Sequence, residues 1–139
     1  MPRPKRERLI CNPPQMQGFR PFGIPMDKIE TVTLTFDEYE SINLLDYKLM
    51  NQEQAAEKMN VSRPTLTRIY ESARRTIANA FIEGKAIVIA GGNVYFEQDW
   101  FRCKKCFKLI SGIENHIKCK GCTAFGTDEL VQLNHKKDE

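Results

Sequence analysis

Histidine and tryptophan are scarce in this chain, and it has no long apolar run. The 139 residues include two histidines and one tryptophan, so few side chains suit acid–base catalysis near neutral pH. Glycine-rich phosphate loops and nucleophile elbows are absent as well. No stretch approaches the ~18–20 apolar residues that cross a bilayer, and the basic start at residues 1–8 is not followed by the apolar segment of a secretory signal. These absences predict a cytoplasmic protein that is not an enzyme and contacts no membrane.

Four of the five cysteines form two Cys-x-x-Cys pairs, Cys103/Cys106 and Cys119/Cys122, which twelve residues separate. Thiols stay reduced in the cytoplasm, which disfavours disulfides as the reason for this pattern. Each pair places two sulfurs on one tight turn, and two such turns complete the tetrahedral shell that Zn²⁺ prefers. Four protein ligands leave no open position, so the pattern predicts a structural zinc site. Iron is the alternative metal, because it also accepts four thiolates.

Charge is unevenly spread along the chain, although the net charge is only +3. Residues 1–34 carry six basic against three acidic side chains, and residues 35–60 carry two against six. The balance returns to four against two over residues 61–84 and reaches six against one over residues 101–122. We therefore expect an acidic surface between basic ones, with particular faces available to an anionic partner.

Helical signals follow one another between residues 35 and 84. Thr35 and Glu38 fit a capping box at the start of a first helix. A second, short helix is expected to begin at Asn51 and to end near Met59. Asn60 follows in the turn, where it tolerates a left-handed backbone better than other non-glycine residues.

A third helix has the clearest pattern in the sequence. Ser62 is its expected cap, Pro64 falls in its first turn, and Gly84 fits a C-terminal stop. Apolar residues recur at helical spacing, and this stripe comprises Leu66, Ile69, Tyr70, Ala73, Ile77, Ala80 and Phe81. The opposite face collects Pro64, Arg68, Glu71, Arg75 and Asn79. The pattern predicts a helix with one buried and one exposed, largely polar face.

The segments on either side of these helices are less regular. Residues 1–34 hold most of the prolines and several basic residues, which predicts an extended basic arm. Residues 85–99 contain two β-prone runs around Gly91-Gly92-Asn93, which predicts a β-hairpin connector. Residues 100–133 would form the zinc module, and residues 134–139 a flexible tail.

The expected fold class is therefore mainly α. A helix-turn-helix domain at residues 35–84 would carry a short β-hairpin and a small C-terminal β module that resembles a zinc ribbon. A module of this size buries too little apolar surface to fold alone, so the metal would supply the missing stability.

A short helix, a tight turn and a longer helix are the parts that hold a rigid rod in the major groove of DNA. An arginine-bearing helix taken alone is often just a solvated face, but here the arginines lie opposite a clean apolar stripe. In a DNA complex, base edges would be contacted by Arg63, Thr65, Thr67 and Arg68, and Ser62 and Pro64 would belong to the same DNA-binding surface. Phosphates would be contacted by Arg3, Lys5, Arg6, Arg8, Arg74 and Arg75.

The segment Gln52–Ala73 resembles the helix-turn-helix of sigma-factor region 4, and the resemblance is strongest in Val61-Ser-Arg-Pro-Thr-Leu-Thr-Arg-Ile-Tyr-Glu-Ser-Ala-Arg-Arg75. Met1-Pro-Arg-Pro, the stretch Phe-Arg-Pro-Phe-Gly-Ile-Pro at 19–25 and the stretch Leu-Thr-Phe-Asp-Glu-Tyr-Glu at 34–40 are more specific. They are similar to a prokaryotic family of small proteins thought to bind DNA, domain of unknown function 134. The resemblance covers about two-thirds of the chain. It implies the helix-turn-helix fold and contact with DNA, but it implies no biochemical role.

The favoured hypothesis is a sequence-specific transcriptional regulator that binds double-stranded DNA, associates with the nucleoid and carries structural zinc. A homodimer is an accompanying expectation, because many helix-turn-helix proteins pair to match two half-sites. Two alternatives remain open at this point. One is an adaptor that binds RNA polymerase or another protein, and the other is a metal or redox sensor that acts through the four cysteines.

Overall fold

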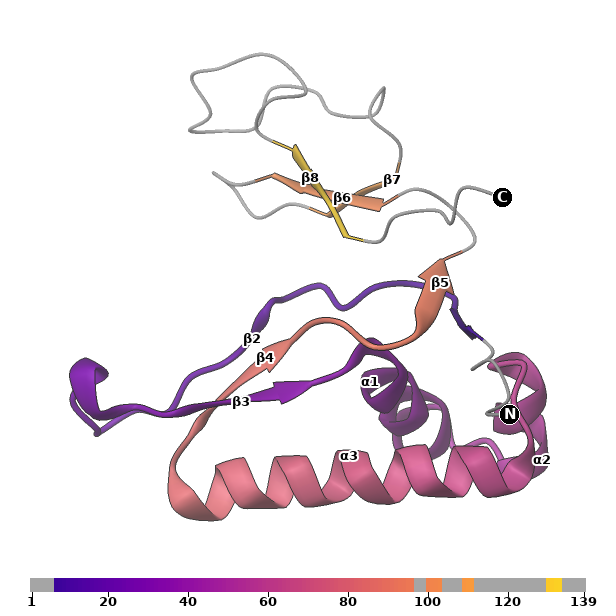
Figure 1. Ribbon diagram of the computed structural model, residues 1–139, viewed down its shortest axis with the longest axis horizontal. Helices are drawn as coiled ribbons and strands as arrows, with labels where there is room; N and C mark the ends of the chain where they lie inside the picture. Colours follow the sequence, from indigo (N-terminus) through magenta and orange to yellow (C-terminus); the bar gives the residue numbers. More distant parts are fainter. Residues whose placement is uncertain (1–6, 97–99, 104–108, 112–129, 134–139) are drawn as a thin grey trace, which may run out of the picture.

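The computed structural model describes residues 7–96, 100–103, 109–111 and 130–133 of the chain. Three α-helices, α1 (Phe36–Ile42), α2 (Gln52–Lys58) and α3 (Arg63–Glu83), are accompanied by a 3-10 turn η1 (Met26–Lys28) and a π-helical turn η2 (Asn43–Tyr47). The strands are β1 (Arg8–Ile10), β2 (Gly18–Phe19), β3 (Thr31–Leu34), β4 (Ala86–Ile89), β5 (Val94–Phe96), β6 (Trp100–Cys103), β7 (Leu109–Ser111) and β8 (Leu130–Gln132). As Figure 1 shows, the long helix α3 runs along one side of the molecule, and β2, β3 and β4 extend beside it.

The prediction of a mainly α fold is wrong, because the helices share the described chain with strands in three small sheets. Their strand orders are β1-β5, β2-β4-β3 and β7-β6-β8. β1 pairs in parallel with β5, and β4 pairs antiparallel with β2 and parallel with β3. The segment expected to be an arm thus contributes three strands from residue 7 onward. Strands of two to four residues show no periodicity, and their partners lie more than 50 residues away along the chain.

The predicted hairpin at residues 85–99 is also wrong, although both β-prone runs are strands. β4 and β5 belong to different sheets and do not pair with each other. Gly91 and Gly92 both have positive φ, 74° and 97°, and the Gly91 carbonyl accepts a hydrogen bond from the Phe36 N–H at 3.1 Å. The two glycines therefore carry the chain past the start of α1 and from one sheet to the next. A hairpin turn would have folded it back.

The helix boundaries agree with the sequence signals. Thr35 and Glu38 form the reciprocal capping box of α1, and Asn51 and Gln54 form another at α2. Gly84 ends α3 in the left-handed conformation, with φ of 70°. Local capping chemistry thus sets where each helix begins and ends.

The hydrophobic core lies between the three helices and strands β1, β3, β4 and β5. Its fully buried side chains include Ile10, Leu44, Met59 and Leu66. Phe36 of α1 and Phe96 of β5 meet edge to face, with ring centroids 5.5 Å apart. Phe81, which the apolar stripe placed in the core, is 82% exposed, because the end of α3 extends past the helices that cover its first half (Figure 1).

The third sheet has β6 at its centre and joins the rest of the molecule through Arg102. This side chain is 5% exposed, and its guanidinium donates hydrogen bonds to the carbonyls of Pro14 at 2.8 Å and Gln15 at 3.0 Å. Burial lowers the pKa of the Arg102 guanidinium. Two carbonyls of the N-terminal segment are therefore held by a strand that lies about 87 residues later in the sequence.

No zinc-ribbon fold is supported by the described residues, and this part of the predicted fold class is withdrawn. Cys103 ends β6, whereas Cys106, Cys119 and Cys122 lie outside the residues that the structure describes. The described side chains contain no group of three or more metal-binding residues. Within the same residues, no helix has the length and apolar character needed to cross a membrane.

Candidate nucleic-acid interface

α2 supports the first half of α3 through a tight turn. The small residues Ala55 and Ala56 of α2 are buried, as is Met59 at its end. The Val61 N–H donates to the Ala56 carbonyl at 2.9 Å. Asn60, in the turn between α2 and α3, has φ of 59°. This is the left-handed conformation that the sequence predicted. Because the turn bonds back onto α2, the two helices are held at one fixed angle.

Ser62 caps α3, as predicted, and engages Thr65 twice. Its hydroxyl oxygen accepts from the Thr65 N–H at 3.3 Å, and the hydroxyl donates to the Thr65 side-chain oxygen at 2.9 Å. The Thr67 hydroxyl donates to the Arg63 carbonyl at 3.0 Å. These local bonds fix the exposed first turns of α3 before any partner arrives.

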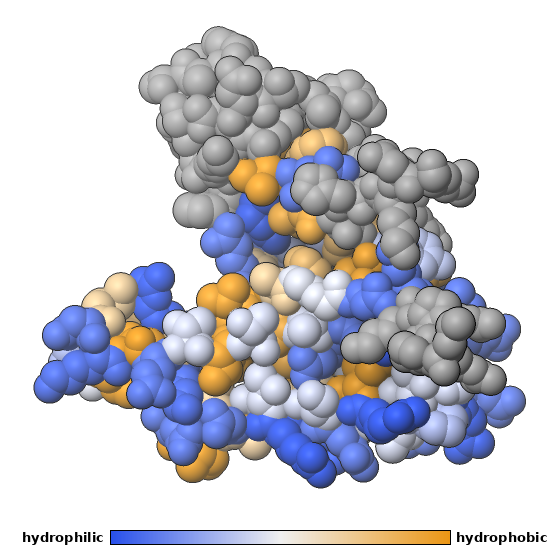
Figure 2. Space-filling view, viewed as in Figure 1, coloured by the Kyte–Doolittle hydropathy of each residue, from blue (hydrophilic) through white to orange (hydrophobic). Residues whose placement is uncertain are grey.

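The four arginines of α3, which we term the arginine face, are all exposed: Arg63, Arg68, Arg74 and Arg75. Within the described part of the chain, none of their guanidinium groups is paired with a carboxylate. Arg68 makes one long hydrogen bond of 3.5 Å from Nε to the Pro64 carbonyl. This bond does not involve the two terminal nitrogens of the guanidinium group. Leu66, Ile69 and Ala73 are buried on the other side of the helix. Hydrophilic residues accordingly line the α3 edge in Figure 2.

Tyr70 positions one of these arginines and anchors α3 to η2. The Arg74 guanidinium lies over the Tyr70 ring, 5.4 Å from its centroid, within the range of a cation–π contact. The Tyr70 hydroxyl donates to the Asp46 carboxylate at 2.7 Å. That hydrogen bond raises the pKa of Tyr70 above its ordinary value, with some contribution from burial.

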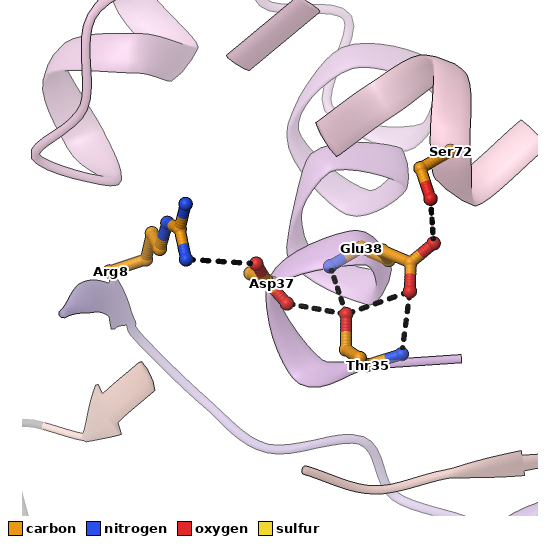
Figure 3. A network of polar contacts seen from close by, with 5 residues as sticks. All are labelled: Arg8, Thr35, Asp37, Glu38 and Ser72. Carbon is orange, nitrogen blue, oxygen red and sulfur yellow. Dashed lines mark hydrogen bonds and ion pairs between the residues drawn. The ribbon is translucent and has the colours of Figure 1, made fainter. Parts of the chain in front are cut away.

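A partly buried polar network ties α1 to α3 (Figure 3). Glu38 accepts from the Thr35 N–H at 3.1 Å and from the Ser72 hydroxyl at 2.9 Å. The Thr35 hydroxyl also contacts the carboxylate of Asp37. The arginine-bearing helix is thus held by a carboxylate that is itself 8% exposed.

The acidic segment seen in the sequence does not form a wholly acidic surface. Three of its six carboxylates, on Asp37, Glu38 and Glu40, are buried. Glu40 accepts from the Cys11 N–H at 3.2 Å and from the Asn43 side chain at 2.8 Å. Because these carboxylates face inward, they do not offset the arginine face at the molecular surface.

Arg8 differs from its predicted role as a phosphate contact. It lies in β1, and its guanidinium is 3.7 Å from the Asp37 carboxylate, with 19% of the side chain exposed. The remaining basic residues of the predicted arm, Arg3, Lys5 and Arg6, lie outside the described residues. The structure therefore brings together the predicted residues of α3 but not Arg8.

Sequence reasoning missed the contacts that position the arginine face. The i, i+4 spacing of Tyr70 and Arg74 is a usual signal for side-chain contact on a helix, but the apolar periodicity groups Tyr70 with the buried stripe. Asp46 and Glu38 lie 24 and 34 residues from their partners, and no local pattern connects them. Only the packing of α1 and η2 against α3 shows these pairs.

The chain matches the family described as protein of unknown function DUF134 over residues 1–97. It belongs to that family. A UPF0251 protein of Chloroherpeton thalassium is 43% identical over 132 residues, covering 94% of this chain and 87% of the relative. Another from Pelotomaculum thermopropionicum is 40% identical, covering 89% and 95%, and one from Methanococcus vannielii is 36% identical, covering 99% and 95%. No solved structure matches the chain.

The family match covers the described parts of the molecule up to β5, including α2, α3 and the network of Figure 3. It ends before β6 and the four paired cysteines. The family region of this chain is thus the part that bears the arginine face.

Proposed function

We propose that this protein binds double-stranded DNA in a sequence-specific manner and acts as a transcriptional regulator associated with the nucleoid. The observation that carries the proposal is the arginine face. It consists of four exposed guanidinium groups without carboxylate partners in the described chain, on a capped helix whose other side is buried. A helix of this kind has the width of the major groove and the charge that a phosphate backbone attracts.

The proposed contacts divide into two kinds. Arg63 and Arg68 lie in the first two turns of α3, where recognition helices usually meet base edges, and a bidentate arginine–guanine pair gives roughly 1–3 kcal/mol of discrimination. Arg74 and Arg75 lie farther along the helix and would neutralise phosphates. Thr65 and Thr67 offer small polar groups beside Arg68, and Ser62 keeps the helix start in place.

We also propose that the four paired cysteines hold a structural Zn²⁺ ion. The support for this proposal is the spacing of the cysteines in the sequence. Thiolates in two Cys-x-x-Cys pairs suit zinc, and iron is the other candidate. Metal analysis of the purified protein, compared with a variant in which Cys119 and Cys122 are both serine, tests this. One zinc per chain that the double variant loses is the expected result, and equal metal content would contradict it.

The DNA proposal is tested by selecting bound sequences from a random pool of duplexes. The affinities for the selected duplex and for a scrambled duplex are then measured at several salt concentrations. Arg68→Ala is expected to lose roughly 1–3 kcal/mol of preference for the selected sequence. Arg75→Ala is expected to weaken both duplexes alike and to lower the slope of log K against log salt by about one.

Glu71→Gln supplies the matched control, because Glu71 is an exposed acidic residue of the same helix that lies between Arg68 and Arg74 in the sequence. Its substitution is expected to strengthen binding to both duplexes, which is opposite in sign to the arginine variants. If no duplex is bound at low salt, or if all variants bind equally, the proposal fails. An adaptor that binds RNA polymerase or another protein would then be the better hypothesis.

A further inference from the structure

We propose that the end of the molecule where α3 finishes is the surface on which two copies of this chain associate. Nine large hydrophobic side chains are exposed in the described chain, and six of them lie at this end. We term them the apolar end: Phe19, Phe22, Met26, Phe81, Ile82 and Val88. Figure 2 shows hydrophobic surface there, at the end of α3 and on the extension that carries η1 between β2 and β3. Apolar groups concentrated in this way usually mark an interaction surface.

The β2–β3 connection and the end of α3 are held together, so the apolar end is one structural unit. A methyl group at Gly84 would lie 2.7 Å from the Ile24 side chain, which shows how closely this connection approaches the helix end. The Lys85 ammonium group is 3.5 Å from Glu30 and 3.1 Å from Glu83. In Figure 1, the connection with η1 extends beyond the last turn of α3.

The apolar end has both a projection and a groove, and this combination favours a second copy as the occupant. Phe22, in the β2–β3 connection, is 100% exposed and lies at the edge of a groove. This open groove has a volume of about 990 Å³, and its walls include Phe19, Ile24, Ile29 and Ile87. In a two-fold dimer, the same patch serves both subunits, so a side chain that projects from one copy needs a hollow on the other. A single chain carries both parts here.

The charges around the apolar end also fit a second copy better than another partner. Arg20, Lys28 and Lys85 supply three positive charges, and Asp27, Glu30 and Glu83 supply three negative ones, so the local net charge is zero. A nucleic acid or a strongly acidic or basic protein selects for a surface of one sign. Lys85 is already paired with Glu30 and Glu83 within one chain, and a rim without net charge does not repel a second copy of itself.

Association at this end leaves Arg63 and Arg68, at the start of α3, free. α3 has 21 residues, which at ~1.5 Å per residue separates its two ends by about 30 Å. Phe81 and Ile82 lie in the last turn, whereas Arg63 and Arg68 lie in the first two. The inference concerns the protein without DNA and does not depend on DNA binding.

Sedimentation velocity of the full chain over a range of concentrations tests the inference. The wild-type protein is expected to sediment as a dimer. Phe22→Ser combined with Phe81→Ser is expected to raise the dimer dissociation constant by at least ~30-fold, as removal of aromatic anchors commonly does. Both side chains are almost fully exposed in one chain, so the thermal unfolding midpoint of the variant at low concentration is expected to stay unchanged.

Tyr47→Ser is the matched control, because Tyr47 is 80% exposed but lies in η2, away from the apolar end. It is expected to leave the dimer intact. The inference is overturned if the wild-type chain is a monomer at every concentration, whether or not it captures some other protein. It is also overturned if the double variant dimerises as strongly as the wild type, or if Tyr47→Ser weakens the dimer equally.

Discussion

At the scale of single residues, Gly92 decides how β4 and β5 are joined. Its φ of 97° favours glycine, and an added Cβ would lie 2.8 Å from the Asp37 carboxylate and 3.1 Å from the Thr35 Cβ. Gly91, its neighbour, also has positive φ, but nothing lies within 4 Å of an added Cβ. A side chain at Gly91 would therefore meet only backbone strain, whereas a side chain at Gly92 would meet both backbone strain and steric contact with the start of α1.

Substitution of these glycines is expected to give unequal losses of stability. Gly91→Ala should lower the free energy of unfolding by about 1–2 kcal/mol, which is the usual penalty for a left-handed alanine. Gly92→Ala should cost at least about 1 kcal/mol more, because it adds overpacking against Thr35 and Asp37. Urea unfolding of both variants measures this. Equal losses would show that the contact with α1 is unimportant.

At the scale of elements, α3 is fixed by partners that come from other segments. Ser72 bonds to Glu38 of α1, and Tyr70 bonds to Asp46 of η2. Both pairs lie on the flanks of α3, between the buried stripe and the arginine face. The orientation of the arginines about the helix axis therefore depends on side-chain hydrogen bonds as well as on apolar packing.

The Tyr70–Asp46 bond has a pH dependence that can be measured. The pKa of Tyr70 is raised in the folded protein, so the bond contributes fully below about pH 10, the pKa of an unfolded tyrosine. As pH rises through the higher folded pKa, the free energy of unfolding falls, because the folded protein holds the proton more tightly than the unfolded chain. Below pH 10, Tyr70→Phe is expected to cost about 0.5–1.5 kcal/mol.

The difference in unfolding free energy between wild type and Tyr70→Phe is therefore expected to shrink above pH 10. Burial raises the pKa of Tyr39 too, but this residue is present in both proteins and its effect cancels in the difference. A difference that stays constant or grows with pH would contradict this account of Tyr70.

The sequence predicted elements well where the signal was local. Each helix cap or turn depends on interactions within four residues, and the structure confirms all those predicted: the Thr35–Glu38 capping box, the turn at Asn60, the Ser62 cap and the Gly84 stop. The sequence-based prediction failed where the hydrogen-bonded partners are far apart along the chain. The strands of residues 8–10 and 18–19 are too short to show alternation, and their pairing with β5 and β4 depends on the packing of the whole chain.

The candidate site follows the same division. The exposure of Arg68 and the burial of Leu66 and Ala73 follow from helical periodicity, which the sequence displays directly. The pairing of Arg8 with Asp37 does not, since it requires β1 to lie beside the start of α1. The predicted hairpin failed because two glycines with positive φ suit a crossing between sheets as well as a tight turn.

At the scale of the whole molecule, Arg102 joins the C-terminal sheet to the N-terminal segment. Its planar guanidinium reaches the carbonyls of Pro14 and Gln15 together, a geometry that the single ammonium group of lysine does not reproduce. The Arg102 side chain and its hydrogen bond to Pro14 are buried, so the Pro14 carbonyl would lose this donor inside the protein if the side chain were shortened.

Arg102→Met is expected to lower the free energy of unfolding by about 1–3 kcal/mol, since the buried Pro14 carbonyl loses this donor. Arg102→Lys should recover part of this loss. Amide hydrogen exchange should speed up in residues 100–103 and in the segment around Pro14 together. Faster exchange in only one of these regions would mean that Arg102 does not couple them.

The most direct measurement of the central claim is the change in backbone amide NMR shifts when a selected DNA duplex is added to the full chain. If the arginine face binds the duplex, the largest changes are expected at residues 62–75, and small changes are expected at residues 81–88. Large changes confined to the end of α3 or to the sheets, or no changes at low salt, would contradict the claim that the arginine face of α3 binds DNA.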